Sequence, residues 1–99
     1  MITVKISDIK PGMNNVALEA KVISKGEIRN VQTRYGPRSV AEFVLEDDSG
    51  QISLSLWEDD IKSVSIGDVV NVSGGYITQF RDKVQLNVPK KTGKMEVIK

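Results

Sequence analysis

The sequence predicts an all-β domain, a small barrel of five strands. Short segments in which apolar and polar residues alternate recur along the chain, separated by turns rich in glycine, proline and aspartate. The one helical pattern between them, Glu58 to Val64, is too short for a free-standing helix. A chain of 99 residues provides one hydrophobic core. Closing the strands into an antiparallel barrel removes exposed sheet edges, so we expect a closed or nearly closed barrel.

The first predicted strand runs from Val16 to Thr33 and changes its pattern partway. Every second residue is apolar from Val16 to Val22, but after Gly26 the apolar positions Ile28 and Val31 no longer keep a period of two. One long strand with a bend or bulge at Lys25-Gly26 is the simplest interpretation. A single helical turn over residues 6–9 is predicted before this strand.

The next two strands are predicted over Ser39 to Glu46 and Gln51 to Trp57. Residues 35–37 and 47–50 have the composition of turns and precede each of them. The third strand has the clearest alternation, because its even positions are apolar and its odd positions are polar apart from Trp57.

The second half of the chain predicts a final hairpin. A fourth strand from Val69 to Phe80 is interrupted by Gly74-Gly75, and Arg81-Asp82 turns it into a fifth strand from Lys83 to Val88. Five strands with a helical link between the third and the fourth match the OB-fold, whereas SH3-like barrels usually lack that link. We expect one OB-fold domain over residues 1–99, with a core at about 5–90. Residues 91–99 are expected to form a basic tail, in which Met95 to Ile98 is a possible short strand.

The composition favours a binding module over an enzyme. Histidine and cysteine are both absent, which excludes Ser-His and Cys-His nucleophiles, disulfides and thiolate metal sites. Two acidic groups, Asp47-Asp48 and residues 58–60, are candidates for a magnesium-dependent hydrolase. The preferred explanations are a turn, in which aspartate is favoured, for the first group and the capping of a short helix for the second. We therefore predict no catalytic residue, metal or cofactor.

The charges are segregated along the chain although the net charge is only +1. Residues 21–40 contain five basic side chains and one acidic one, residues 41–60 contain seven acidic side chains and no basic one, and residues 81–99 contain six basic and two acidic ones. Such a chain presents a basic surface while it stays nearly neutral overall. The alternative is chance clustering on solvated loops. No apolar run or leader indicates a membrane span or secretion, so we expect a cytoplasmic location, at the nucleoid in a prokaryote.

Three of the five aromatic residues fall where the alternation predicts solvent. Trp57 shares the polar face of the third strand, and Tyr76 and Phe80 share one face of the fourth strand. Lys83, Gln85 and Asn87 form the polar face of the fifth strand. The alternatives are that Trp57 and Phe80 cover a barrel end, or that the glycines change the phase of the fourth strand. The functional interpretation is a platform on which unpaired bases stack.

The ordered set of segments resembles a known family, the single-OB-fold single-stranded DNA-binding proteins of archaea and their eukaryotic relatives, which are similar to replication protein A domains. The resemblance covers about residues 5–90 and includes a tryptophan at the end of the third strand. The matching segments are Asp8 to Met13, Val31 to Arg38, Glu46 to Trp57, Gly67 to Val70, Gly75 to Phe80 and Val84 to Asn87.

The resemblance implies that bases stack on Trp57, Tyr76 and Phe80. It also implies that Arg29, Val31 and Thr33 approach the nucleic acid. This chain has Asn87 where some eukaryotic relatives have a fourth aromatic residue. The glycine-rich or acidic tail of many members is absent, which leaves open a tailless variant, a shortened chain or one module of a longer protein.

Phosphate contacts are expected from the basic residues of the two loops that frame the groove of an OB-fold. The candidates are Arg29, Arg34, Arg38, Arg81 and Lys83. Together these features predict a sequence-tolerant binder of single-stranded DNA that protects strands exposed in replication and repair, with replication or repair proteins as further partners and no membrane. Two alternatives remain: a module for RNA such as tRNA, and a protein-interaction domain of a replication complex.

Overall fold

The computed structural model describes residues 3–89 and 93–98, with the side chain of Phe80 outside the described part. A 3-10 turn, η1 (Ile6–Asp8), precedes the first strand, and a short helix, α1 (Asp59–Lys62), links two strands. The strands are β1 (Val16–Lys25), β2 (Arg29–Thr33), β3 (Gly36–Glu46), β4 (Gln51–Trp57), β5 (Val69–Phe80), β6 (Lys83–Asn87) and β7 (Lys94–Ile98).

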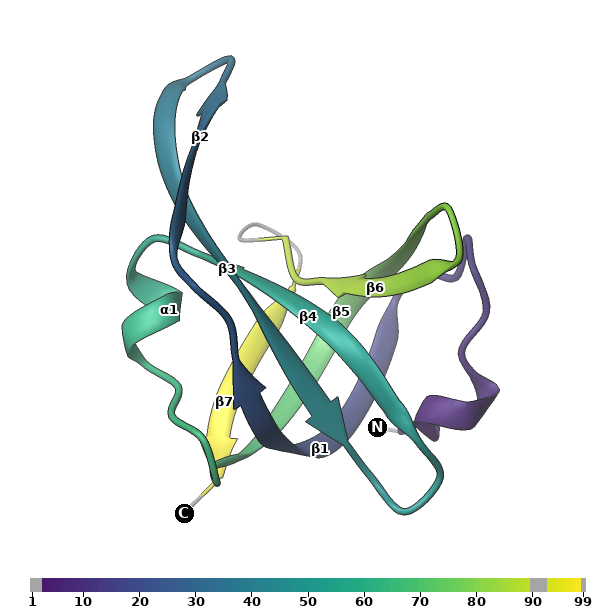
Figure 1. The fold of residues 1–99 in the computed structure, drawn as a ribbon. Coiled ribbons are helices and arrows are strands. Elements are labelled where there is room, and N and C mark those ends of the chain that lie inside the picture. The colour runs from purple at the N-terminus through teal and green to yellow at the C-terminus, as the bar shows by residue number, and fades with distance from the viewer. Residues whose placement is uncertain (1–2, 90–92, 99) are drawn as a thin grey trace.

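The strands form one sheet that closes on itself (Figure 1). The order is β1-β3-β4-β6-β5, and β5 pairs again with β1. All of these pairs are antiparallel except β4 with β6, which is parallel. Outside this ring, β2 pairs with β3 and β7 pairs with β5. The predicted five-stranded closed barrel is confirmed.

Several predicted boundaries agree with the structure, but the long first strand is interrupted. Residues 26–28 separate β1 from β2, although both pair with β3, and the bulge lies at Val22 to Ser24 rather than at the glycine. Gly26 N–H donates to the carbonyl oxygen of Glu42 at 2.7 Å. A Cβ at this glycine would lie 2.8 Å from that oxygen, so the chain bends here because its backbone lies so close to β3.

The last described segment is a strand and not a loose tail. β7 pairs with β5 from Val69↔Ile98 to Ser73↔Lys94, which is the short strand considered as an alternative, extended by one residue. Lys91 and Lys99 of the expected basic tail lie outside the described residues.

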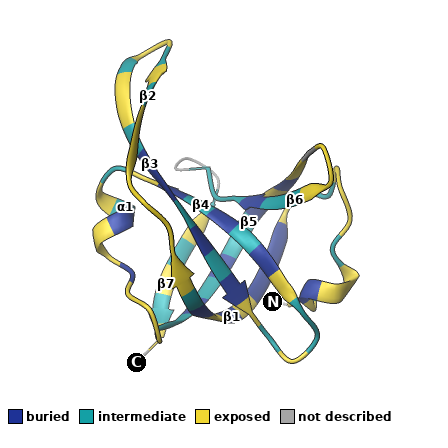
Figure 2. Cartoon of the chain, in the orientation of Figure 1, coloured by how far each residue is buried: buried dark blue, intermediate teal, exposed yellow. Residues whose placement is uncertain are grey.

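The core is almost entirely aliphatic, and its buried residues lie along the strands of the barrel and in the helical link (Figure 2). Among the described side chains, the one aromatic member of this core is Phe43, which is fully buried, as are Leu18, Leu54 and Leu86. The even positions of β4 are buried, as the alternation predicts. Ile61 and Val64 of the helical link close the core from one side.

The acidic turn between β3 and β4 has a structural role. The Asp47 carboxylate accepts hydrogen bonds from the backbone N–H groups of Ile6, Ser49 and Gly50 at 2.7–3.1 Å. Burial raises the pKa of Asp47, but a hydrogen bond from the Ser49 hydroxyl together with these backbone hydrogen bonds outweighs burial and holds that pKa below its ordinary value. Asp48 pairs with Lys5. The turn therefore ties η1 to the barrel.

A bulge in β5 changes which side of that strand faces the core. Val16 pairs with Gly75, but Leu18 pairs with Val72. A step of two residues along β1 thus corresponds to a step of three along β5, which leaves one extra residue in β5. Val72 is buried on one side of the bulge and Ile77 on the other, which reverses the alternation. Gly74 has a φ of 67°, in the left-handed region that favours glycine. Tyr76 points outward because of this bulge.

We predict that Gly75→Ala lowers the free energy of unfolding by about 1–3 kcal/mol, as overpacking does. A Cβ at this position would lie 2.8 Å from Leu86 Cδ1 and 3.2 Å from the Asn87 carbonyl oxygen, where β5 passes β6. Urea unfolding followed by circular dichroism measures the change. Gly50→Ala is the control, because its nearest contact would be Ile6 Cγ2 at 3.7 Å. Equal stability of the two variants would contradict the close approach.

Candidate nucleic-acid interface

One continuous outer face crosses four neighbouring strands. Tyr76 of β5 pairs with Asn87 of β6, which lies beside Ser55 of β4, which in turn pairs with Glu42 of β3. Residues at paired positions of a sheet point to the same side. Trp57 is two residues beyond Ser55 and therefore shares this face. The polar side of the predicted third and fifth strands is thus the outside of the barrel.

Trp57 and Tyr76 are partly covered and still open to solvent. Their exposed fractions are 36% and 41%, while Leu56 and Ile77 beside them are buried. Both rings therefore have the predicted outward orientation. For Tyr76 this orientation depends on the bulge, which changes the phase of the alternation along β5. The backbone of Phe80 pairs with Lys83 at the far end of the same hairpin. Its side chain lies outside the described residues.

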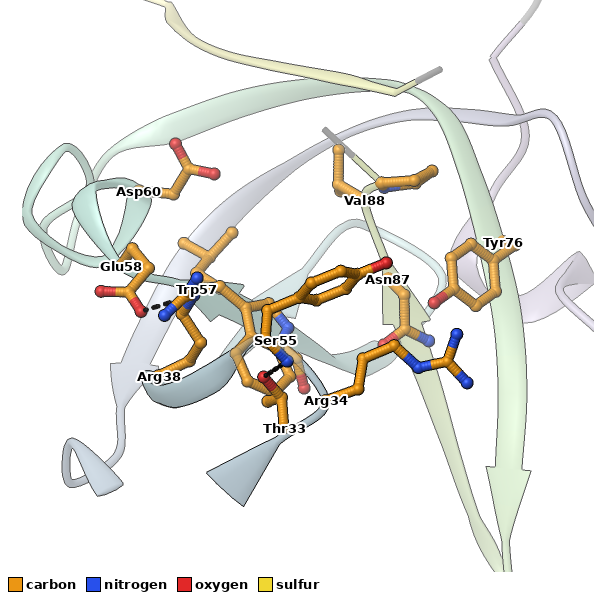
Figure 3. A pocket seen from close by; sticks show the side chains of 13 residues that line it. Thr33, Arg34, Arg38, Ser55, Trp57, Glu58, Asp60, Tyr76, Asn87 and Val88 are labelled. Carbon is orange, nitrogen blue, oxygen red and sulfur yellow. Dashed lines mark hydrogen bonds and ion pairs between the residues drawn. The ribbon is translucent and has the colours of Figure 1, made fainter. Parts of the chain in front are cut away.

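A pocket of about 720 Å³ lies over this face (Figure 3). That volume is typical of a ligand site. Six predicted site residues line the pocket: Thr33, Arg34, Arg38, Trp57, Tyr76 and Asn87. The lining also includes Tyr35, Ser55, Leu56, Glu58, Asp60, Val88 and Pro89. The hairpin of β2 and β3, the ends of β4 and β6, and Tyr76 from within β5 thus contribute to one concave site.

The β2–β3 hairpin continues the same face. Arg29, Val31 and Thr33 pair with Val40, Arg38 and Gly36, and Val40 pairs with Trp57 on its other side. These three predicted residues therefore lie on the side of the sheet that carries Trp57. Arg29 and Val31 lie outside the pocket lining.

Glu58 holds Arg38 beside the pocket. Its Oε1 lies 3.7 Å from Arg38 Nε and accepts the Ser39 N–H at 3.2 Å. The Glu58 N–H donates to the Ser39 carbonyl oxygen at 3.0 Å, and its φ of 52° turns the chain out of β4. The prediction that this acidic group caps the helix is wrong for Glu58, because its side chain binds β3 instead of the helix N-terminus.

The remaining predicted residues lie toward the β5–β6 turn. Lys83 forms an ion pair with Glu42 across β4, and Gln85 donates a hydrogen bond to Ser55 Oγ. The hydrogen bond from Lys83 holds the pKa of Glu42 below its ordinary value. Asn87 Nδ2 donates to Thr78 Oγ1 at 3.0 Å. Arg81 occupies the turn with a φ of 58° and does not line the pocket.

The sequence interpretation missed Tyr35, the most exposed of the large apolar and aromatic side chains that line the pocket. The sequence pattern assigns this residue only to a turn. Its position next to Arg34, in a chain with few aromatic residues, is the signal that identifies it.

The described residues offer neither a cluster of metal ligands nor a membrane-spanning helix. They contain no group of three or more aspartate or glutamate residues arranged to hold a metal ion. Among the helices in residues 3–89 and 93–98, none has the length and apolar character needed to cross a membrane.

A closed barrel with this strand order and an open outer face defines an OB-fold domain. Residues 22–97 match the family model described as "OB-fold nucleic acid binding domain", and the chain belongs to that family.

Relatives and solved structures agree with this assignment. The chain is 34% identical over 88 residues to the single-stranded DNA binding protein Ssb of Saccharolobus solfataricus, and the match covers 89% of this chain and 60% of that protein. It is 37% identical over 82 residues to replication factor A of Methanothermobacter thermautotrophicus, covering 81% of this chain and 10% of that protein. The second OB-fold domain of replication protein A from Methanococcus maripaludis has a similar fold, with a TM-score of 0.78 and 24% identity over 98% of this chain and 95% of that domain.

Proposed function

We propose that this chain binds single-stranded DNA without sequence preference or catalysis and protects strands exposed in replication and repair. The observation that carries the proposal is that Trp57 and Tyr76 remain exposed on one face and line the same pocket as Arg34 and Arg38. The names of the two relatives, a single-stranded DNA binding protein and a replication factor A, support it. The chain spans 60% of the first relative and a tenth of the second.

Stacking explains both the tolerance of sequence and the selection of single strands. Every base has an aromatic face, so a base can stack on Trp57, Tyr76 or Phe80 whatever its hydrogen-bonding edge. Each such stack contributes about 1–3 kcal/mol. Paired bases hide these faces inside the duplex, so a duplex cannot use the platform.

The basic side chains around the platform supply the phosphate contacts. Arg34 has no ion-pair partner among the described residues, whereas Arg38 pairs with Glu58 and Lys83 with Glu42. Arg34 is therefore available to a phosphate at a lower cost than Arg38 or Lys83. Arg29 and Arg81 are the remaining proposed contacts, one on the hairpin and one in the β5–β6 turn.

A second candidate is the binding of structured RNA on the same face. The matching family model is named for the tRNA anticodon, which favours this alternative. Both candidates use the same aromatic face, so binding experiments must separate them.

Titration with oligo-dT, oligo-rU and a DNA hairpin duplex tests the proposal. Trp57 is the only tryptophan, so its fluorescence reports on the pocket directly. We expect oligo-dT to quench the emission strongly and saturably, because a base covers the indole, and we expect the duplex to bind far more weakly. Tighter binding of oligo-rU or tRNA would favour the second candidate. Equal affinity for all three ligands would contradict stacking.

Trp57→Ala is expected to weaken binding of oligo-dT about ten- to a hundredfold, which corresponds to the loss of one stacked base. Fluorescence anisotropy of a labelled oligonucleotide measures this change without the tryptophan. The melting temperature should stay close to that of the wild type, since the buried residues of β4 are unchanged. Unchanged affinity with a loss of about 3–5 kcal/mol of stability would instead identify Trp57 as a core residue.

The affinity for oligo-dT should fall with salt. With about three to five phosphates neutralised, the slope of log affinity against log salt is expected to be roughly −2 to −3.5, at about −0.7 per contact. Arg34→Ala should flatten the slope by about one contact and leave base preference unchanged. Lys62→Ala, on the exposed side of α1, is the control and should leave the slope as in the wild type. A slope near zero would show that the basic residues do not face the ligand.

A further inference from the structure

Tyr35 is exposed to an extent that its place in the turn does not explain. Its exposed fraction is 76%, the highest among the exposed large apolar and aromatic side chains of the described residues. Tight turns favour glycine, proline, asparagine, aspartate and serine for their backbone conformations, and tyrosine has no such advantage. Tyr35 nevertheless lines the same pocket as Trp57 and Tyr76.

We propose that Tyr35 is a further base-stacking residue, which makes the pocket two-sided; this inference rests on the proposed binding of single-stranded DNA. One wall is the outer face of β4, β5 and β6 with Trp57 and Tyr76. The other is the tip of the β2–β3 hairpin with Tyr35. A base that enters between the walls is covered on more of its surface than a base on an open platform.

The hairpin tip has a defined conformation, which a stacking residue requires. Thr33 Oγ1 accepts the Tyr35 N–H at 3.1 Å and donates to the Gly36 carbonyl oxygen at 2.7 Å. Gly36 has a φ of 102°, so it closes the turn at little cost. These contacts fix the backbone on both sides of the ring.

The hairpin is held at its base and stands away from the barrel at its tip (Figure 1). Among the described strands, β2 pairs only with β3. Near the base, Ser39 and Glu58 exchange two hydrogen bonds at 3.0 and 3.2 Å, which fasten β3 to the end of β4. The tip therefore keeps its position over the pocket and still leaves room for a strand to enter.

The residue beside Tyr35 supports the same use of the tip. The Arg34 side chain extends toward the Tyr76 end of the pocket (Figure 3). An arginine next to an aromatic ring offers a nucleotide a cation for its phosphate and a surface for its base. Arg34 and Tyr35 together would thus hold one nucleotide from the hairpin side.

The test compares Tyr35→Ala, Tyr35→Phe and Ile66→Ala for binding of oligo-dT. Ile66 is the matched control, because it is exposed, as Tyr35 is, and lies outside the pocket. We expect Tyr35→Ala to weaken binding about five- to a hundredfold, mainly through faster dissociation. Tyr35→Phe keeps the ring and should bind as the wild type does. All three melting temperatures should stay near that of the wild type.

Oligo-dT with a single base removed at successive positions gives a second readout. In the wild type, removal of a base that would stack lowers the affinity. In Tyr35→Ala this loss should disappear at one position, because removing the base and removing the ring eliminate the same contact. The inference is overturned if the wild type binds and Tyr35→Ala matches Ile66→Ala, or if every position keeps its loss. If the wild type itself does not bind oligo-dT, the proposed function fails, and with it this inference.

Discussion

The outer face depends on β5, which must satisfy two neighbours at once. Its first half packs Val70 and Val72 into the core beside β1, while its second half pairs with β6 and packs Ile77 inward. A strand with strict alternation cannot do both, because the side-chain period of two would turn Tyr76 into the core. The extra residue at the bulge corrects the phase, and Gly75 lets β5 approach Leu86 closely. The same bulge therefore allows the barrel to close and places Tyr76 on its outer face.

Acidic side chains organise the basic ones on this face. Glu58 holds Arg38 and joins β3 to β4, and Glu42 pairs with Lys83 across β4. Each pair is partly exposed, so it contributes little to stability. Each pair does restrict where the basic side chain lies, but its carboxylate then competes with a phosphate for that side chain. Although the net charge is near zero, the basic groups of this face differ: Arg34 is available, whereas Arg38 and Lys83 are held in place by carboxylates.

Local patterns predicted most of the fold, and the failures come from contacts between distant segments. The bounds of β4 and β5 follow from alternation and turn residues. The break at residues 26–28 depends on the approach of Gly26 to Glu42 in another strand, which spacing alone does not reveal. β7 pairs with β5, so its existence depends on an open sheet edge. In the site, the alternation of apolar and polar residues in β4 predicts the outward orientation of Trp57. Only the folded barrel brings the side chains of the hairpin tip to the same pocket.

The choice of core residues separates stability from the site. Aliphatic side chains and Phe43 fill the barrel, so Tyr35, Trp57 and Tyr76 are not needed to complete the core. The exposed part of an aromatic ring leaves apolar surface in water and gains nothing for the fold. Three such rings around one pocket therefore need a cause outside folding. A ligand with flat, apolar faces and negative charges satisfies the rings and the arginines together, and unpaired nucleotides have both properties.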